Sequence, residues 1–302
     1  MVYPLDSEEA VVGWISEITG ESADTVLLRL RQEYDSPGIN EQRGFAAAGL
    51  ERHTWSSGLE DFYRQTDAFL YELAVWNCNR LKLRMRKWLA NYLSGSGQGR
   101  LNILCIGDGL GFDSVYLSQI GHTVTYFEMA GFTESFARRV FAENGAAITV
   151  LTDPAQIPRN EYDVVVCLDV LEHIHQPGGF VEDISGYIRP GGRLIVHAPF
   201  YMVCRTSPTH LKSNRKYSGS ISLFTKRDLR FIDGDFRWTP LVFEKPADGL
   251  ITACHRNLLK LFLLRLIGFY FMVGRFWFLP FLPIRHYRRG HRNWFGKFQG
   301  CR

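Results

Sequence analysis

Between residues 101 and 199, five short apolar runs alternate with stretches of helical periodicity. Each run has the length and composition of a buried strand: LNILCI, HTVTYF, AITVL, YDVVVCL and RLIVHAP. Strands that alternate with helices form βαβ units, in which the strands are parallel and helices cover both faces of the sheet. This stretch is therefore predicted to be an α/β domain built on a parallel sheet.

The N-terminal third of the chain has a helical pattern instead of short apolar runs. Asp6 or Ser7 and then Ser22 precede stretches of helical spacing and are candidate helix caps, and one long helix is expected over residues 67–93. The Ser-Gly linker SGSGQG at residues 94–99 follows directly. Clusters of Ser and Gly separate structured elements, so the linker is predicted to mark a domain boundary.

Three parts are expected from this pattern: a helical N-terminal domain over residues 1–95, the sheet domain over residues 100–256 and an extension over residues 257–302. Within the sheet domain, Thr225 is expected to cap a helix through KRDLRFI, and LVFEKPADGLITAC reads as two strands around a PADG turn.

The composition excludes several classes of protein. Of the 302 residues, 46% are hydrophobic and 22% are charged, which excludes a disordered chain, collagen and a coiled coil. The six cysteines are far apart and form no CxxC pair, so neither a disulfide framework nor a zinc site is suggested. With an N-terminus that lacks the pattern of a signal peptide, a reduced cytoplasmic protein is expected.

The net charge of +4 hides an asymmetry. Asp248 is the last acidic residue and ten basic residues follow it, so the end of the chain carries +10 and the remainder −6. Lys260, Arg265 and Arg275 interrupt the apolar part of the extension, and a central Arg costs roughly 2.5–3.5 kcal/mol on insertion scales, so a transmembrane span is not expected. Contact with a membrane surface, or packing on the body or on a second subunit, is expected instead.

The first strand runs directly into the turn GDGLGF, in which Gly107, Gly109 and Gly111 alternate with other residues. A strand, a Gly-rich turn and a helix form a nucleotide-binding crevice at the carboxyl end of a parallel sheet. Glycine is needed there because the turn adopts unusual φ and ψ values and the ligand approaches the backbone closely. Glu128 follows about 20 residues later, where an acid can bind ribose hydroxyls. The dinucleotide fingerprint GxGxxG fails because its last position is Phe112.

From Asn102 to Pro199 the chain resembles the class I S-adenosylmethionine-dependent methyltransferases. ILCIGDGLG looks like the glycine motif of that family, CLDVLEHI like its segment after the fourth strand, and RPGGRLIVHAP like its turn into the fifth strand. The resemblance implies a Rossmann-like sheet of seven strands, of which two form a terminal antiparallel hairpin that LVFEKPADGLITAC fits. It also implies S-adenosylmethionine as the cofactor. Extra helices in that family usually form a substrate lid, so the helical part at residues 1–95 is expected to be a substrate or lid domain. Its aromatic residues are expected to divide between core packing and the lid: Trp55, Phe62, Tyr63, Phe69, Tyr71 and Trp76.

The resemblance also implies which residues bind the cofactor. The glycine turn contributes Gly107, Asp108, Gly109 and Gly111, Glu128 matches the family's ribose acid, Asp153 lies where adenine is often contacted, and Asp169 lies on the loop after the fourth strand. One position departs from the pattern. The family usually has an acid two residues before the first glycine, where this chain has Cys105, and Asp108 or Asp113 is the expected substitute near the cofactor's ammonium.

A methyl acceptor with a hydroxyl group benefits from a general base, most often His. His210, in the polar loop after the fifth strand, is the first candidate for that role, and His173 in the LEHI segment is the second. His175 is expected to be exposed, and His197 reads as a histidine of the core.

Two further groups of residues each have two possible interpretations. Asp169, Glu172 and His173 resemble the metal-binding cluster of ubiquinone-pathway O-methyltransferases, although cofactor-loop and capping roles explain the acids more simply, and no metal is predicted. A basic patch in the loop after the fifth strand is either a solvated surface or a site for an acidic group of the substrate, and its members are Arg205, Lys212, Arg215 and Lys216.

The sequence thus predicts a methyltransferase that modifies a small-molecule acceptor, most readily at oxygen. The acceptor is expected to be apolar, lipid-linked or anionic, and the protein to be cytoplasmic, with the extension as a route to the membrane surface or to a homo-oligomer. A non-catalytic binding protein of the same fold and a nucleic-acid methyltransferase that uses the basic extension are the alternatives, and nucleic acid is the less expected partner.

Overall fold

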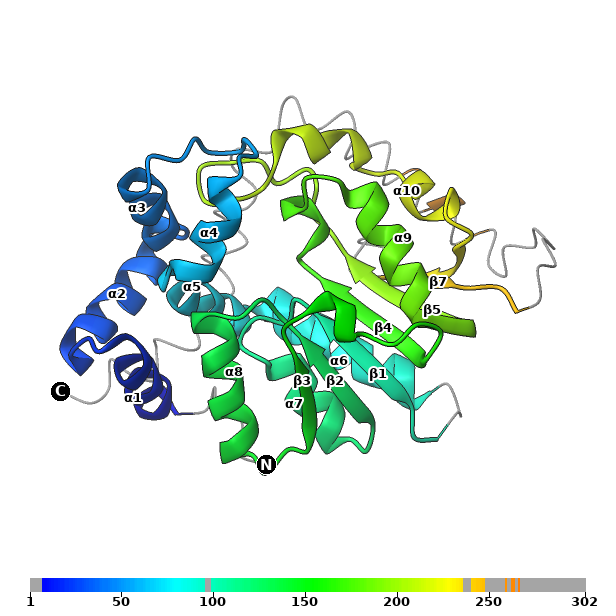
Figure 1. Ribbon diagram of the computed structural model, residues 1–302, viewed down its shortest axis with the longest axis horizontal. Helices are drawn as coiled ribbons and strands as arrows, with labels where there is room; N and C mark the ends of the chain where they lie inside the picture. The colour runs from blue at the N-terminus through cyan, green and yellow to red at the C-terminus, as the bar shows by residue number, and fades with distance from the viewer. Residues whose placement is uncertain are drawn as a thin grey trace.

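The computed structural model describes residues 7–95, 99–235 and 240–247, together with Leu259, Phe262, Leu263 and Leu266. In this part of the chain, seven strands form one sheet in the order β3-β2-β1-β4-β5-β7-β6 (Figure 1). The strands are β1 (Asn102–Ile106), β2 (Thr123–Phe127), β3 (Ile148–Leu151), β4 (Tyr162–Leu168), β5 (Ile188–His197), β6 (Arg230–Gly234) and β7 (Leu241–Glu244). The first five are parallel, and β7 is antiparallel to both of its neighbours. The predicted α/β fold with a seven-stranded sheet is confirmed.

The terminal hairpin uses other residues than predicted. The helix expected through KRDLRFI is wrong, because α10 (Ser222–Thr225) ends at Thr225 and Arg230–Gly234 is strand β6. This strand pairs with β7, which contains LVFE, whereas the other predicted strand, LITAC, lies outside the described residues. Phe231 and Phe243 lie side by side on one face of the hairpin with ring centroids 5.9 Å apart, and burial of these rings outweighs the local helical pattern.

The sheet is covered on both faces. Along β4, Val165 and Cys167 point to the face covered by α9 (Pro177–Tyr187), whereas Val164 and Val166 point to the other face. Helices α6 (Arg80–Ser94) and α7 (Phe112–Gln119) cover that second face. Strands that are buried on both faces are continuous apolar runs in the sequence, which explains why YDVVVCL shows no alternation of apolar and polar residues.

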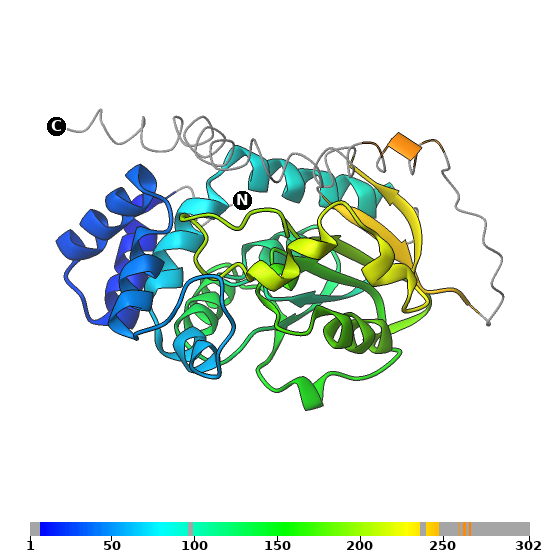
Figure 2. The same ribbon diagram turned by 90° about the horizontal axis from the view of Figure 1, so that it is seen from above.

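The N-terminal helices gather at one end of the molecule (Figure 2). They are α1 (Glu8–Thr19), α2 (Ala23–Asp35), α3 (Ile39–Ala47), α4 (Gly58–Gln65) and α5 (Ala68–Asn77). Side chains of α1, α2 and α5 share one hydrophobic cluster with α7 and α8 (Phe132–Glu143). The helical part therefore packs directly on the sheet domain.

The helix ends are set by side-chain caps. Ser7 and Ser22 accept hydrogen bonds from the backbone N–H groups of Ala10 and Thr25, as predicted, whereas Asp6 lies outside the described residues. The single helix expected over residues 67–93 is wrong, because the chain breaks between α5 and α6. Asn79 causes the break, since its side chain accepts a hydrogen bond from the N–H of Leu81 at 2.8 Å and so caps α6.

No helix in the described ranges combines the length and the apolarity that a membrane span requires. The predictions for the extension at residues 257–302 lie outside the described residues, apart from four positions. Of these, Leu259, Phe262 and Leu266 are each more than half exposed.

A buried cluster of charges joins α6 to the start of α7. Asp113 receives the Lys82 ammonium at 2.9 Å and the Arg86 guanidinium at 2.6 Å, and all three side chains are at least 94% buried. Arg86 also donates to the side-chain oxygen of Asn77 at 2.6 Å. Burial opposes ionisation of Asp113, but its two cationic partners outweigh this and lower its pKa to about 2.

Asp113→Asn should destabilise the protein by about 3–5 kcal/mol, because it leaves two buried cations without their shared partner. Since the pKa of Asp113 is depressed in the folded state, its contribution is present above the ordinary value of 3.8 and is lost as the pH falls toward 2. Urea unfolding monitored by circular dichroism measures the difference. Asp183→Asn, which removes an exposed ion pair with Arg159, is the matched control and should change stability by less than about 0.5 kcal/mol. Equal effects of the two substitutions would contradict the prediction.

Candidate active site

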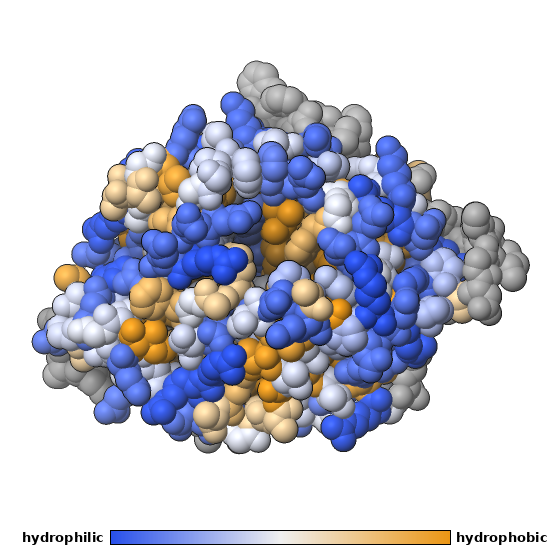
Figure 3. Space-filling view, viewed as in Figure 1, coloured by the Kyte–Doolittle hydropathy of each residue, from blue (hydrophilic) through white to orange (hydrophobic). Residues whose placement is uncertain are grey.

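A cavity of about 610 Å³ opens at the carboxyl ends of the parallel strands, between the sheet and helices α3 to α5. On the face shown in Figure 3, hydrophobic surface lies near the centre and is surrounded by hydrophilic side chains. Gly107, Gly109 and Glu128 line one part of the cavity, and Glu172, His173 and His210 line another. The crevice predicted from the glycine turn thus coincides with a large cavity.

The glycine turn can be built only from glycine. Gly107, Gly109 and Gly111 have φ values of 68°, 59° and 77°. A Cβ atom would lie 2.4 Å from Val170 at Gly107 and 2.6 Å from Leu73 at Gly109. Side chains at these positions would be strained and would also fill the cavity wall. Gly111 differs from the other two, because it lies against Phe141 of α8 and does not line the cavity.

Glu128 follows β2 and faces the same part of the cavity. Its two carboxylate oxygens accept hydrogen bonds from the backbone N–H groups of Gly109 at 3.0 Å and Met129 at 3.1 Å. Each oxygen retains a lone pair, so the carboxylate can also accept from a pair of hydroxyl groups. Burial raises the pKa of Glu128 to about 7, and the two backbone hydrogen bonds oppose this shift.

Two other predicted cofactor residues do not line the cavity. The Asp108 carboxylate accepts from the backbone N–H groups of Asp113 and Ser114 and thereby caps the start of α7. Asp153 is exposed, and its side chain caps the short helical turn after β3 by accepting from Ala155. Asp113, the other substitute expected for the acid missing at Cys105, is committed to Lys82 and Arg86. These carboxylates serve helix ends and the buried ion cluster.

Asp169 does line the cavity, at the end of β4, with a φ of 60°. Its carboxylate receives hydrogen bonds from the ring of His197 at 2.5 Å and from the indole of Trp76 at 3.1 Å. Burial alone would raise the pKa of Asp169, but the His197 ring, Lys82 and the hydrogen bonds together lower it well below its ordinary value. His197, expected as a core histidine, is buried and orients this carboxylate.

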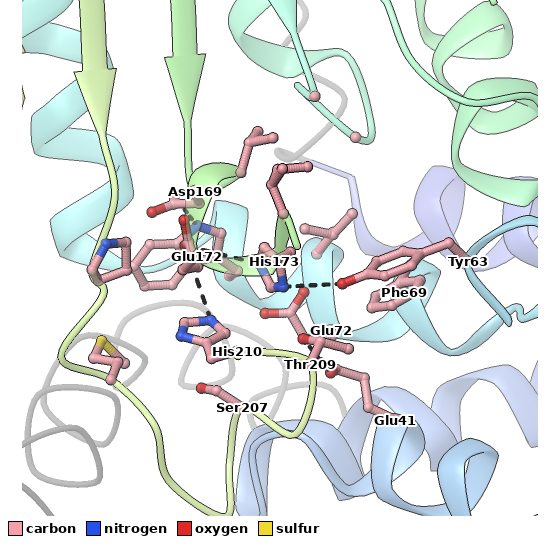
Figure 4. A pocket seen from close by; sticks show the side chains of 18 of the residues that line it. Glu41, Tyr63, Phe69, Glu72, Asp169, Glu172, His173, Ser207, Thr209 and His210 are labelled. Carbon is pink, nitrogen blue, oxygen red and sulfur yellow. Dashed lines mark hydrogen bonds and ion pairs between the residues drawn. The ribbon is translucent and has the colours of Figure 1, made fainter. Parts of the chain in front are cut away.

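His173 and His210 meet around the buried carboxylate of Glu172 (Figure 4). The Nε2 atoms of the two rings lie 3.8 Å and 4.0 Å from Glu172 Oε1, and the ring centroids are 4.7 Å apart. The Nδ1 atom of His173 lies 3.0 Å from the hydroxyl of Tyr63. Both oxygens of Glu172 and the Nδ1 atom of His210 are buried without a hydrogen-bond partner in the described structure. The two predicted catalytic histidines are therefore brought together.

Burial controls the protonation of this cluster. It lowers the pKa of His173 to about 4, and together with the adjacent His173 it lowers that of His210 well below its ordinary value. Burial, followed by the charge of Asp169, raises the pKa of Glu172 well above its ordinary value. Both imidazoles are therefore neutral near pH 7, and Glu172 competes with them for one proton.

Among the described residues, the same three side chains have the arrangement of a metal-binding site. One ligand atom from each of Glu172, His173 and His210 lies within 4.8 Å of the others. The sequence grouped Asp169 with Glu172 and His173 instead, but Asp169 is turned toward His197 and Trp76. The unpartnered oxygens of Glu172 fit a divalent cation, which Glu172, His173 and His210 would hold.

The helical N-terminal part supplies two acids that no sequence pattern marked, beside aromatic residues that were expected to serve core packing or a lid. Glu41 of α3, Tyr63 of α4 and Glu72 of α5 line the cavity beside the histidine cluster. Trp55 stacks on His175 with ring centroids 4.1 Å apart, at the cavity wall. No motif marks these positions, because their proximity to the site arises from packing between distant segments.

The loop after β5 is held in place by the N-terminal part. The ring of His53 lies 3.0 Å from the backbone carbonyl of His210, and Lys212 donates a backbone hydrogen bond to His53. The basic side chains of this loop do not line the cavity: Arg205, Lys212, Arg215 and Lys216. The structure thus favours a surface role for the basic patch over contact with a bound acceptor.

The sequence of residues 104–196 matches the family described as a methyltransferase domain. This segment is similar to a methyltransferase domain. It begins inside β1 and ends inside β5, so it contains the glycine turn, Glu128 and the Glu172–His173 segment. The resemblance to class I methyltransferases inferred from the glycine motif and the LEHI segment is confirmed for this domain.

Curated relatives of the methyltransferase domain share a name. The chain is 30% identical over 122 residues to a ubiquinone biosynthesis O-methyltransferase of Shewanella pealeana, a match that covers 38% of this chain and 49% of the relative. It is 32% identical over 110 residues to the protein of the same name from Bordetella avium, covering 35% and 45%. The chain thus spans about half the length of the curated relatives it matches.

Solved structures include similar chains at low identity. An N-methyltransferase from Bradyrhizobium japonicum, in complex with S-adenosyl-L-homocysteine, is 17% identical, with a TM-score of 0.43 over 56% of this chain and 89% of that one. The magnesium protoporphyrin IX methyltransferase of Synechocystis is 19% identical, with a TM-score of 0.43 over 63% and 90%.

If Glu128 binds ribose hydroxyls as a carboxylate, affinity for S-adenosylhomocysteine should depend on pH. Because its pKa is raised to about 7, lowering the pH from 8 to 6 removes most of the ionised form, and affinity should fall by up to about tenfold. Calorimetric titration at several pH values measures this. Glu128→Gln should weaken binding and flatten the profile, whereas Glu161→Gln, an exposed control, should leave it unchanged. A flat profile in the unaltered protein would contradict the prediction.

Proposed function

We propose that this protein is an S-adenosylmethionine-dependent methyltransferase that methylates a hydroxyl oxygen of a small molecule. The observation that carries the proposal is one cavity that joins the glycine turn and Glu128 to the cluster of Glu172, His173 and His210. The names of the curated relatives support oxygen as the methylated atom.

The residues around the glycine turn suit the cofactor. Gly107 and Gly109 leave room for close approach to the backbone, and the Glu128 carboxylate offers lone pairs to ribose hydroxyls. When bound, S-adenosylmethionine supplies an already activated methyl group. The protein then has to hold the acceptor oxygen in line at near-attack distance and to exclude water.

The histidine cluster suits proton removal from the acceptor. His210 lines the cavity with a neutral imidazole, so a ring nitrogen can accept the hydroxyl proton. The Glu172 carboxylate, 4.0 Å from its Nε2, would stabilise the resulting imidazolium. His173 is held by Tyr63 and faces the same carboxylate, which makes it a neighbour that orients the acceptor.

Cofactor binding is the first test. Calorimetry with S-adenosylmethionine and S-adenosylhomocysteine should show one site per chain for each, because the glycine turn and Glu128 contact parts that the two molecules share. Absence of binding for both would exclude the enzyme and favour a binding protein that shares only the fold.

For the base, His210→Ala should lower turnover by about 10²–10⁴-fold while affinity for S-adenosylhomocysteine stays within about twofold. His175→Ala is the matched control from the cavity wall, and it should retain turnover because His175 lies outside the Glu172 cluster. Single-turnover assays with the radiolabelled cofactor separate chemistry from product release. Unchanged turnover in His210→Ala would remove it as the base.

The extension at residues 257–302 is proposed to bring the enzyme to a membrane surface, where a lipid-linked acceptor would be found. The sequence supports this because the extension carries nine basic residues and many aromatic residues, and the exposure of Leu259, Phe262 and Leu266 agrees with it. Packing on a second subunit remains the other proposal for the extension.

A further inference from the structure

A buried asparagine follows His210 on the loop after β5. The side-chain nitrogen of Asn214 donates to backbone carbonyl oxygens of the short helical turn after β4 and of the residue that ends it. The accepting carbonyls belong to Leu171 at 3.3 Å, Glu172 at 3.2 Å and Ile174 at 2.8 Å. One side chain of the loop thus binds the turn at both of its ends.

An amide suits this position better than a carboxylate or an apolar side chain. The side-chain amide of Asn214 has two N–H protons, which the three carbonyl oxygens can share. A carboxylate would place a negative charge and no donor against the same oxygens. An apolar side chain would leave buried carbonyl groups without their partner, which costs about 1–3 kcal/mol for each group.

The loop is bound to the same turn at a second point. The backbone N–H of Leu211 donates to the carbonyl oxygen of Glu172 at 3.0 Å, and the N–H of Asn214 donates to the carbonyl of Leu211 at 3.0 Å. The Leu211 side chain is buried in a hydrophobic cluster with residues of the N-terminal helices. Because Leu211 directly follows His210, these bonds fix the loop that carries His210 against the turn that carries Glu172.

Contacts among the side chains of the histidine cluster do not hold the cluster together. The Nε2 atoms of His173 and His210 lie 3.8 Å and 4.0 Å from Glu172 Oε1. Both distances are longer than a hydrogen bond. The spacing of these three side chains therefore depends on the backbone of the turn and of the loop, which Asn214 and Leu211 join.

We propose that Asn214 is a positioning residue that holds Glu172 and His173 against His210 and so sets the geometry for proton removal from the acceptor. This inference rests on the proposed methyltransferase function, because it concerns the base of that reaction. Asn214 does not line the cavity, so it acts through the turn and not by contact with the acceptor or the cofactor.

Nuclear magnetic resonance tests the positioning directly. In the full-length protein, without ligand and in EDTA, a nuclear Overhauser cross peak is expected between the ring protons of His173 and His210, whose rings meet edge to face. Asn214→Asp keeps the shape of the side chain and removes both donors, so it should remove most of this intensity. Asn214→Ala should do the same without an added charge. Absence of the cross peak from the unaltered protein, or its retention in both variants, would overturn the proposal.

Single-turnover assays with radiolabelled S-adenosylmethionine and catechol separate positioning from a purely structural role. Asn214→Asp should lower the rate of methyl transfer by about 10²-fold, because a small misplacement of the base is costly. Affinity for S-adenosylhomocysteine should stay within about twofold, since Asn214 does not touch the glycine turn. An unchanged rate despite loss of the cross peak would make Asn214 structural only and would contradict the proposal.

Asn144→Asp is the matched control. The Asn144 side chain also donates to a backbone carbonyl, that of Val140 at 2.8 Å, but it does so at the end of α8. This variant should keep both the cross peak and the rate. Equal losses in Asn144→Asp and Asn214→Asp would point to general destabilisation and would overturn the proposal.

Hydrogen exchange in the unaltered protein provides a test that does not depend on the folding of a variant. The side-chain amide protons of Asn214 should exchange slowly, because buried carbonyl oxygens hold them. Exchange as fast as that of the exposed Asn91 would refute the proposed contact.

The two proposals fail in distinguishable ways. The cross peak and the exchange rate are measured without a ligand, so a negative result there refutes the role of Asn214 alone. Absence of S-adenosylhomocysteine binding to the unaltered protein refutes the methyltransferase function itself.

Discussion

The three glycines after β1 touch side chains from three different parts of the chain. A Cβ atom would meet Val170 at Gly107, Leu73 at Gly109 and Phe141 at Gly111, in every case at 2.6 Å or less. Those neighbours belong to the turn after β4, to α5 and to α8. The close approach of this backbone turn therefore fixes where the sheet, the N-terminal helices and the flanking helix meet. The cavity exists because these elements cannot approach further.

The buried charges beneath the turn stabilise the same arrangement. Asp108 caps the start of α7, and Asp113 one turn later receives Lys82 and Arg86 from α6. Helix α6 is thereby joined to the start of α7 by ion pairs and to the sheet by apolar contacts of Leu89 and Leu93. Cys105, the departure from the family pattern, is buried beside these charges. Asp113, which was expected to substitute for the acid missing at Cys105, is instead held by Lys82 and Arg86 and does not line the cavity.

The sheet could be predicted from the sequence because each of its parallel strands is a short run with its own apolar signal. Glu128, His173 and His210 could be located for the same reason, since each lies near the carboxyl end of such a run or shortly after it. The antiparallel strand Arg230–Gly234 was misread as a helix, because its polar residues carry no strand pattern without the partner strand. The break at Asn79 was missed because one capping side chain decides it. The cofactor roles of Asp108 and Asp153 stay predictions, but both carboxylates cap helices and neither lines the cavity, which spacing alone does not show.

The acids of the N-terminal helices could not be found from any motif. Glu41 and Glu72 lie on helical segments that show only an amphipathic pattern, and they reach the cavity because α3 and α5 pack together and α5 approaches the glycine turn.

The two parts of the chain have different roles in this geometry. The sheet domain carries the groups suited to the cofactor and the proton, whereas the N-terminal helices add charge and aromatic surface around the acceptor. Substitutions in α3 and α4 can then alter which acceptor binds without altering the glycine turn. Changes at Leu73 of α5 affect both, because Leu73 touches Gly109 from the helix that carries Glu72. Specificity and cofactor binding are therefore separable on α3 and α4 but coupled on α5.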